Sequence, residues 1–473
     1  MRAHGKLVVV VTLGTLAGCA LEAPPAPSEY MEQALPNLVL PERWGAGDQA
    51  EGAVTAGWPA AFADPRLDAL IAEAILHNPD LLVAAARVEA AAQYVELAKA
   101  AMRPAVNLLG TGGLKMGGGD VGSALQGVSL GVSWEPDLWG RLRSARAASE
   151  RSYEQVIADT EYARQSIAAL VAKSYFLAVE AGLQQRLAED MLSAAEQLVM
   201  LAEERRRVGR GDSYEVALSR ANAETFRDSV LQLSFSREQA QRAIEALVGR
   251  YPSATVDIAT ELAQWPGPVP GGLPSELLER RPDVIAADRR VAAAFSRVQE
   301  AKAARLPSIS LTTSINSISS ELFVLQDREN PVWSAGLSLL APLYSGRALK
   351  SQVEIRSAEQ RQAVADYGRI GARAFGEVES ALAAELTAGR REQVLNLAAA
   401  ANQEALNLAQ IRYQVGSGDL RAVQQQQVAV HGSRSALVRV QTERLVQRVN
   451  LHLALGGSFD PDSPTVARAD PAP

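Results

Sequence analysis

The chain has 473 residues, of which 47% are hydrophobic but only 5% aromatic, and Ala, Leu and Val carry most of the apolar fraction. This composition is typical of long helices that pack at small residues. A single Cys and four His argue against a zinc or iron–sulfur site, and one sulfur excludes an internal disulfide. A formal net charge of −7 leaves no basic excess for phosphates, which argues against a nucleic-acid partner.

The N-terminus combines a basic start, an apolar stretch and the cysteine. Arg2 and Lys6 precede an apolar stretch at 7–17, which is too short to span a bilayer and is typical of a signal peptide. The L-A-G-C sequence at 16–19 resembles the bacterial lipoprotein signal, and this implies removal of residues 1–18 and acylation of Cys19, for example with palmitate. A disordered terminus with a chance cysteine is the alternative. Ala20 stands where an inner-membrane retention signal would show Asp, which favours the outer membrane.

An internal duplication organises the rest of the chain. N-P-D-L at 78–81 recurs as R-P-D-V at 281–284, and V-G-R-G-D at 208–212 recurs as V-G-S-G-D at 415–419. The spacing between such matches stays close to 205 residues along the chain. The sequence therefore predicts two copies of one unit, at 64–252 and 272–457.

Each copy predicts the same order of elements. A helix begins at Pro79 or Pro282, and a hairpin follows, with strands at about 105–115 and 125–134 in the first copy and about 308–318 and 332–341 in the second. The G-G-G-D sequence at 117–120 is expected as the loop of the first hairpin. A long helix without Pro then runs over about 140–207 or 346–414, roughly 100 Å at 1.5 Å per residue. A Gly-containing turn and a returning helix (213–248 or 420–455) close the copy. A solvent-exposed coiled coil is the alternative for the long helices, but their Ala-rich stripes favour a sheet of helices.

The four strands cannot close a membrane barrel by themselves. No segment after the signal approaches eighteen consecutive apolar residues, so any membrane crossing is expected to use strands. About eight strands are the smallest known membrane barrel, and open sheet edges cannot face lipid. Three copies would supply twelve strands, and the same symmetry would arrange the long helices as a tube.

The residues at the ends of the hairpins carry a family resemblance. W-E-P-D-L-W-G-R at 134–141, P-L-Y-S-G-R at 342–347 and L-G-G at 455–457, together with the lipoprotein signal and the duplication, resemble the outer-membrane efflux factors of the TolC/OprM/NodT type. The resemblance implies a mainly α fold with a small transmembrane β part, namely a trimeric 12-stranded β-barrel continued by an α-helical barrel. It assigns residues 19–63 and 253–271 to an equatorial belt, and residues 458–473 to a flexible tail.

The resemblance also implies a function and partners. The chain would be the outer-membrane channel of a tripartite efflux system, passing small toxic molecules outward and thereby contributing to multidrug resistance. It would work as a homotrimer in outer-membrane lipid and extend into the periplasm, with a periplasmic adaptor protein and a proton-driven inner-membrane transporter as partners. Such a duct needs no cofactor or metal, and no catalytic set of residues can be proposed, so we do not expect an enzyme. A type I protein secretion duct is the main alternative, and a structural periplasmic lipoprotein is a weaker one.

The resemblance assigns an aperture to the turn before the last helix. Relatives carry acidic side chains there, whereas residues 424–427 of this chain are four Gln. Arg421 and Gln425 are expected at the constriction with Gln424 beside them. Three guanidiniums facing one axis would repel one another unless Asp419 or a neighbour pairs with them. The expected consequence is weaker cation selectivity than in a channel ringed by acids. A solvated outer face is the alternative for these residues.

Two further roles follow from the resemblance. Tyr413 matches a latch position, and a hydrogen bond to Glu215 is expected, with Asp212 and Arg210 nearby. The turns are expected to dock the adaptor through Gly209, Gly211, Gly416 and Gly418. Each Gly has an alternative local role, since a residue that ends a helix often needs a positive φ. The substitution Gly418→Trp is expected to separate the two roles, because Gly418 lies beyond the first cap position.

Overall fold

The computed structural model describes residues 24–46, 54, 56–111, 114–117, 120–123, 126–272, 274–319 and 332–460. The chain divides into two compact units. Unit 1 takes its described residues from 24–34, 89–155 and 287–367, and unit 2 takes them from 35–88, 156–286 and 368–460. The signal segment, Cys19 and residues 461–473 lie outside the described residues.

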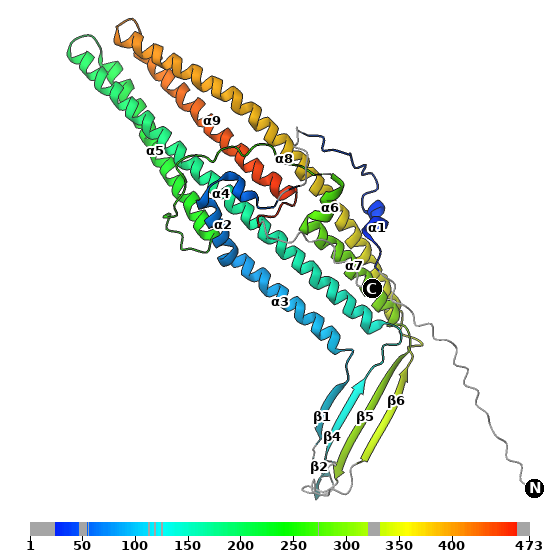
Figure 1. The fold of residues 1–473 in the computed structure, drawn as a ribbon. Coiled ribbons are helices and arrows are strands. Elements are labelled where there is room, and N and C mark those ends of the chain that lie inside the picture. Colours follow the sequence, from blue (N-terminus) through cyan, green and yellow to red (C-terminus); the bar gives the residue numbers. More distant parts are fainter. Residues whose placement is uncertain are drawn as a thin grey trace, which may run out of the picture. The chain divides into compact units, whose positions relative to one another are not determined.

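Unit 1 contains a four-stranded antiparallel sheet. Its strands are β1 (Ala105–Thr111), β4 (Gln126–Trp134), β5 (Ser308–Ser319) and β6 (Val332–Leu340), in the order β1-β4-β5-β6. The two hairpins of the duplication therefore join through β4 and β5, with Trp134 opposite Leu311 (Figure 1). Within the described residues, β1 and β6 each pair on one side only.

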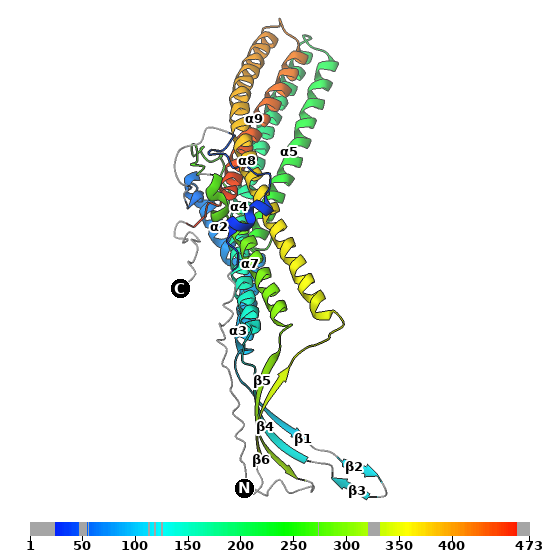
Figure 2. The same cartoon turned by 90° about the vertical axis from the view of Figure 1, so that its right-hand side faces the viewer.

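The first hairpin differs from its prediction. The strand expected to run to 115 ends at Thr111, and a separate small hairpin follows, formed by β2 (Leu114–Gly117) and β3 (Asp120–Ser123) (Figure 2). Gly117 and Asp120, at the two ends of the Gly-rich stretch, pair with each other in this added hairpin. The four main strands otherwise lie within a few residues of the expected ranges.

The helices repeat in length between the two copies. The helices that begin at the prolines are α3 (Pro79–Ala100) and α7 (Pro282–Ala303), with 22 residues each. The long helices α4 (Arg141–Arg207) and α8 (Ala348–Gln414) have 67 residues each, and the returning helices α5 (Ser213–Leu247) and α9 (Leu420–Ala454) have 35 each. The expected duplication and its mainly α character are therefore confirmed.

Short helices occupy the segments around the copies. These are α1 (Pro27–Ala34), the 3-10 turn at Trp58–Phe62, α2 (Pro65–His77), the 3-10 turn at Pro274–Glu276 and α6 (Leu277–Arg280). Asp64 caps α2 by accepting a hydrogen bond from the Arg66 amide at 3.0 Å. Pro65 fits the first turn of α2 because proline lacks an N–H and an N–H at this position would have no partner within the helix.

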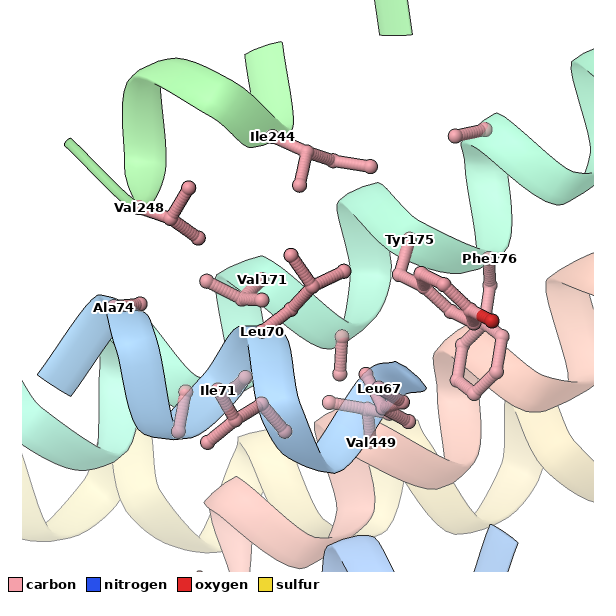
Figure 3. Packing of buried hydrophobic residues seen from close by; sticks show 14 of the residues in the cluster. Leu67, Leu70, Ile71, Ala74, Val171, Tyr175, Phe176, Ile244, Val248 and Val449 are labelled. Carbon is pink, nitrogen blue, oxygen red and sulfur yellow. The ribbon is translucent and has the colours of Figure 1, made fainter. Parts of the chain in front are cut away.

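The main hydrophobic cluster lies in unit 2. It joins α2, α4, the ends of α5 and α9, and the link after α5, as in the packing of Leu67 and Phe176 (Figure 3). One 18-residue window of α4 has a mean hydropathy of 1.4, high enough for a membrane span, and the bent pair α2 and α3 also passes such a test together. Val171, Tyr175 and Phe176 of α4 are at most 1% exposed within this cluster, so the apolar part of α4 serves the protein core.

Each copy closes at the residue that precedes its proline-initiated helix, α3 or α7. The Asn78 side-chain amide donates to the Leu247 carbonyl at the end of α5, at 2.8 Å. The equivalent Arg281 donates to the Ala454 carbonyl at the end of α9, at 3.0 Å. Both contacts satisfy a helix-end carbonyl that has no partner within its own helix. The same architectural joint is therefore made with two different side chains.

Candidate functional site

The two turns between long and returning helices have the same backbone design. The amides of Gly209 and Arg210 donate to the carbonyls of Arg206 and Arg205, at 3.0 and 2.8 Å. The amides of Gly416 and Ser417 repeat this pattern at the end of α8, at 3.1 and 2.9 Å. These are Schellman caps, which need a left-handed residue at the first position after the helix. We call residues 208–212 and 415–419 the two tips.

The glycines of the tips divide into two kinds. Gly209 and Gly416 have φ of +74° and +81°, and a Cβ on either would meet nothing within 4 Å. A Cβ on Gly418 would lie 2.9 Å from the backbone nitrogen of Tyr413, and one on Gly211 would lie 2.9 Å from a Glu215 carboxylate oxygen. Gly211 and Gly418 therefore let each turn close on its own helix. A Trp at position 418 would deform the tip itself, so the expected discriminating power of Gly418→Trp is lost.

An aspartate caps the returning helix at each tip. Asp212 accepts a hydrogen bond from the Glu215 amide at 2.8 Å, and Asp419 accepts one from the Arg421 amide at 3.0 Å. Carboxylates at this position accept hydrogen bonds from the unpaired amides of the first helical turn and interact favourably with the positive end of the helix dipole. Asp419 thus contacts the backbone of Arg421, and no contact between its carboxylate and the Arg421 guanidinium is found among the described residues.

The guanidinium of Arg421 has a different neighbour. It donates to the Tyr214 hydroxyl at 3.0 Å and lies 5.9 Å from the centre of that ring. Arg421 and Gln425 are both exposed and, four residues apart on α9, share one face. Gln424 is only 7% exposed, and its amide nitrogen has no hydrogen-bond partner among the described residues. Gln424 is therefore buried, whereas Arg421 and Gln425, with which it was expected to line the constriction, are exposed.

Tyr413 is buried beside the tip of the first copy. Its side chain is 1% exposed, and the Arg205 guanidinium lies 4.5 Å from the centre of its ring and donates to its carbonyl at 3.2 Å. Burial, and then the nearby Glu215 carboxylate, raise the pKa of the Tyr413 hydroxyl. The hydroxyl nevertheless has no hydrogen-bond partner in the described part of the chain. The structure brings Tyr413 and Glu215 near each other without forming the expected hydrogen bond.

The interior behind the tips is partly polar. The Asn222 amide donates to the Gln427 carbonyl oxygen at 3.3 Å, and Ser219 is 1% exposed. The Glu215 carboxylate also keeps one buried oxygen without a described partner. Sequence reasoning missed Arg205, Tyr214 and Asn222, because these contacts join residues more than 200 positions apart. The near match of residues 205–214 to 412–421 in the duplication was the available signal.

A corner in unit 1 joins the sheet to a long helix. After β4, the indole N–H of Trp139 donates to the Pro307 carbonyl at 2.6 Å, which ties the first copy to the start of β5 in the second. The carboxylate of Asp137 accepts from the amides of Leu142 and Arg143, at 3.1 and 2.9 Å, and so caps α4. Arg141 forms an ion pair with Glu135 at 2.8 Å. The W-E-P-D-L-W-G-R sequence therefore forms the connection between strand β4 and the long helix α4.

The comparison with known proteins decides the family. The sequence profile of the outer membrane efflux proteins matches residues 70–250 and 273–457, which are the two copies. The chain belongs to the outer membrane efflux protein family. Its resemblance to this family, inferred from the motifs, is confirmed.

Relatives match over nearly their whole length. The pyoverdine export outer membrane protein OpmQ of Pseudomonas putida is 31% identical over 424 residues, covering 86% of this chain and 89% of that protein. The outer membrane protein OprJ of Pseudomonas aeruginosa is 30% identical, covering 97% and 96%. The structure of the Neisseria gonorrhoeae MtrE outer membrane channel in its open state superimposes with a TM-score of 0.81 at 28% identity, covering 91% and 98%. The fold of this chain is that of an outer-membrane efflux channel.

Proposed function

We propose that three copies of this chain form a duct in the outer membrane that exports small toxic molecules delivered by an inner-membrane transporter and a periplasmic adaptor. The carrying observation is the sheet of unit 1, whose two edge strands are each paired on one side only among the described residues. Four strands are too few for a membrane barrel, whereas three such sheets joined edge to edge give twelve.

The faces of the sheet support a position in lipid. Val106, Leu108 and Leu130 are 63%, 73% and 42% exposed, and the register places Leu108 opposite Leu130 on one face. Trp333 and Leu337 of β6 are 72% and 67% exposed and lie at alternate positions of their strand. A strand that alternates in this way presents one apolar face, as lipid-facing barrel strands do.

The relatives favour small molecules over proteins as cargo. The names of the two relatives above refer to pyoverdine export and to an outer membrane protein, and another relative is named an antibiotic efflux pump outer membrane protein. We therefore place efflux before type I protein secretion, and the transporter is expected to be proton-driven. Lipid anchoring at Cys19 remains part of the proposal and rests on the L-A-G-C sequence.

Accumulation assays in the native host test the export function. Deletion of the gene should raise the cellular accumulation of fluorescent toxic dyes several-fold, and the wild-type chain should restore the low level. The variant Ser417→Trp places a bulky group at an exposed tip position without a positive-φ or glycine requirement, and Ser417→Ala is its matched control. Block of export by Ser417→Trp at unchanged membrane level supports docking at the tips. Unchanged dye accumulation in the deletion strain, together with loss of a secreted protein, would favour the secretion duct.

The aperture and the anchor have their own tests. Planar-bilayer recordings should show weaker cation selectivity than an acid-ringed channel if Arg421 and Gln425 face the axis, and Arg421→Glu should then raise that selectivity while Gln425→Glu adds to it. Strong block by trivalent cations in the wild type would contradict this assignment. For the anchor, labelled palmitate should be incorporated into the wild type and not into Cys19→Ser; incorporation into both would place the acyl chain elsewhere.

A further inference from the structure

The four connections between helices and strands of unit 1 lie at one end of its sheet. The register places Ala105 opposite Ser133 in the first hairpin. It places Ser308 opposite Leu340 in the second, and β4 pairs directly with β5. The strand ends that lead to helices therefore form a single edge, from which the helices depart (Figure 1). We call the four connecting segments the junction surface: residues 101–104, 135–143, 304–307 and 341–347.

Three of these segments carry positive charge without acidic residues. Each has one Arg and no Asp or Glu, although the chain as a whole has a net charge of −7. The three residues are Arg103, Arg305 and Arg347, and all of them are exposed. Their guanidiniums form no hydrogen bond or ion pair within the part of the chain that the structure describes. They are therefore open to an anion from outside the chain.

The remaining segment, at 135–143, neutralises its own arginines. Glu135 forms an ion pair with Arg141 at 2.8 Å. The duplication makes Arg141 equivalent to Arg347, since each follows the Gly that precedes a long helix. In the second copy Ala341 and Leu343 stand where the first copy has its two acids. The second copy thus keeps the cation and lacks the carboxylates that would occupy it.

Exposed apolar side chains accompany the unpaired arginines. Leu343 and Tyr344 are 95% and 91% exposed, and Leu306, which follows Arg305, is 44% exposed. A hollow of about 340 Å³ lies between three of the four segments. Its walls are mainly apolar and include Pro136, Leu138, Trp139, Pro307, Leu340 and Pro342. The junction surface therefore offers cations and apolar area side by side, which suits an amphiphile better than a purely ionic partner.

We propose that the junction surface binds anionic phospholipids, in the membrane leaflet on the helical side of the sheet, with Arg103, Arg305 and Arg347 contacting the headgroup phosphates. This inference rests on the proposed position of the sheet in lipid. It goes beyond that proposal because it assigns a class of lipid and the residues that select it.

The place and the chemistry of the junction surface fit a headgroup. Strands with an apolar face end there, so the junction surface lies at the level where bilayer hydrocarbon gives way to phosphates. A guanidinium donates two parallel hydrogen bonds to phosphate oxygens, and a tyrosine such as Tyr344 is favoured at the same level. A headgroup with net negative charge should bind best, because each cation near an anionic surface strengthens attraction about fivefold.

The apolar side chains decide between a lipid and free phosphate. Leu343 and Tyr344 are almost fully exposed, and inorganic phosphate would leave them in contact with water. A phospholipid covers them with its glycerol and the first part of its acyl chains, and removal of apolar area from water is favourable. The same contact that binds the phosphate therefore also buries the apolar part of the junction surface.

Native mass spectrometry of the full-length protein tests the inference. After incubation in mixed micelles of phosphatidylglycerol and phosphatidylethanolamine, the wild type should retain phosphatidylglycerol in preference. Arg347→Gln should lower this preference about fivefold, and Arg305→Gln with Arg347→Gln about twenty-five-fold. Arg347→Lys should keep most of it. The matched control is Arg361→Gln, which removes an exposed arginine of α8 outside the junction surface and should leave the preference within twofold of the wild type.

Two further measurements exclude other occupants. Inorganic phosphate added in excess should not displace the retained lipid, and complete displacement would overturn the choice of a lipid. A spin label on Tyr344→Cys, in protein reconstituted into phosphatidylglycerol-containing vesicles, should be relaxed by oxygen dissolved in the lipid. A label shielded from both oxygen and a water-soluble relaxing agent would show that a second copy of the chain covers this surface, and that would overturn the proposal.

The outcomes also separate this inference from the proposed function. An equal loss of preference in Arg347→Gln and Arg361→Gln, or none in either, overturns the inference. If such a protein still exports dye from the native host at normal rates, the proposed function stands. Absence of the wild-type chain from the outer-membrane fraction would overturn both.

Discussion

The two copies of the duplication reach the same fold through different chemistry where each copy closes. In the first, Asn78 accepts from the Asp80 amide at 2.9 Å and donates to the Leu247 carbonyl. In the second, Arg281 occupies that place, is 1% exposed, and binds Asp283 and Glu377 at 2.8 and 2.7 Å as well as the Ala454 carbonyl. An amide needs only hydrogen bonds, whereas a buried charge needs counter-charges. The second closure is therefore the one that a single substitution can damage most.

Removal of the buried charge should give the largest difference between the copies. Arg281→Met leaves the buried Asp283 carboxylate without its main partner and removes one partner of the partly exposed Glu377, and we expect a loss of about 3–5 kcal/mol in the free energy of unfolding. Asn78→Ala loses a cap and one carbonyl contact, so about 1–2 kcal/mol is expected. Denaturant unfolding in detergent, followed by circular dichroism, measures both.

Arg373 must be taken into account in the comparison of Arg281→Met with Asn78→Ala. Its guanidinium lies 3.2 Å from Asp283, so it supplies part of the compensation after Arg281 is lost. The double variant Arg281→Met with Asp283→Asn should recover stability relative to Arg281→Met alone. An equal loss for Asn78→Ala and Arg281→Met would contradict the role given to charge.

The pH dependence should also distinguish the copies, at the equivalent positions 245 and 452. Glu245 is 1% exposed; burial opposes its ionisation, but the amides of Ala254, Thr255 and Val256 donate to its carboxylate and hold its pKa below 4.5. His452 is 3% exposed beside Trp58, and burial, with Arg448 nearby, lowers its pKa to about 3. Both groups bind protons more weakly in the folded state than in the unfolded state. The free energy of unfolding should therefore decrease as the pH falls.

The two windows differ. His452 should lose stabilisation from about pH 6.5 downward, by up to about 1.4 kcal/mol per pH unit, and Glu245 only below about pH 4.5. Between pH 6.5 and 5, His452→Gln should flatten the dependence of unfolding free energy on pH, and Glu245→Gln should leave it parallel to the wild type. A His452→Gln slope equal to that of the wild type would show that the imidazole does not carry the effect.

The stability losses of glycine-to-alanine variants should show how tightly each of the two closures is packed. A Cβ on Gly249 would lie 2.8 Å from the His77 carbonyl oxygen, whereas one on Gly456 would lie 3.2 Å from a side-chain carbon of Arg281. Both have positive φ, as does Gly209, around which a Cβ would meet nothing within 4 Å. We expect Gly209→Ala to cost about 1 kcal/mol, Gly456→Ala somewhat more, and Gly249→Ala about 2–4 kcal/mol. Thermal unfolding of the three variants tests the order, and equal midpoints would refute it.

The sequence by itself determined the local elements and their duplication. Prolines at 79 and 282, and the glycines that follow the long helices, fix where helices begin and end, because they act through the backbone of their own segment. The repetition of these signals made both copies predictable, with helix bounds within one or two residues. The break of the first strand at Thr111 escaped prediction, since Gly-rich sequence specifies a turn without specifying which strands flank it.

Only the tertiary structure decided what the site residues contact. Tyr413 and Glu215 are correctly placed near each other, yet no hydrogen bond joins them, and the Arg205 guanidinium lies over the tyrosine ring instead. Gln424 and Gln425 are neighbours in sequence and about 100° apart around the α9 axis, yet one is buried and the other is exposed. Such outcomes depend on the angle at which two helices meet, and that angle comes from side chains hundreds of residues apart. Local signals act within a few residues of the chain, so they cannot encode it.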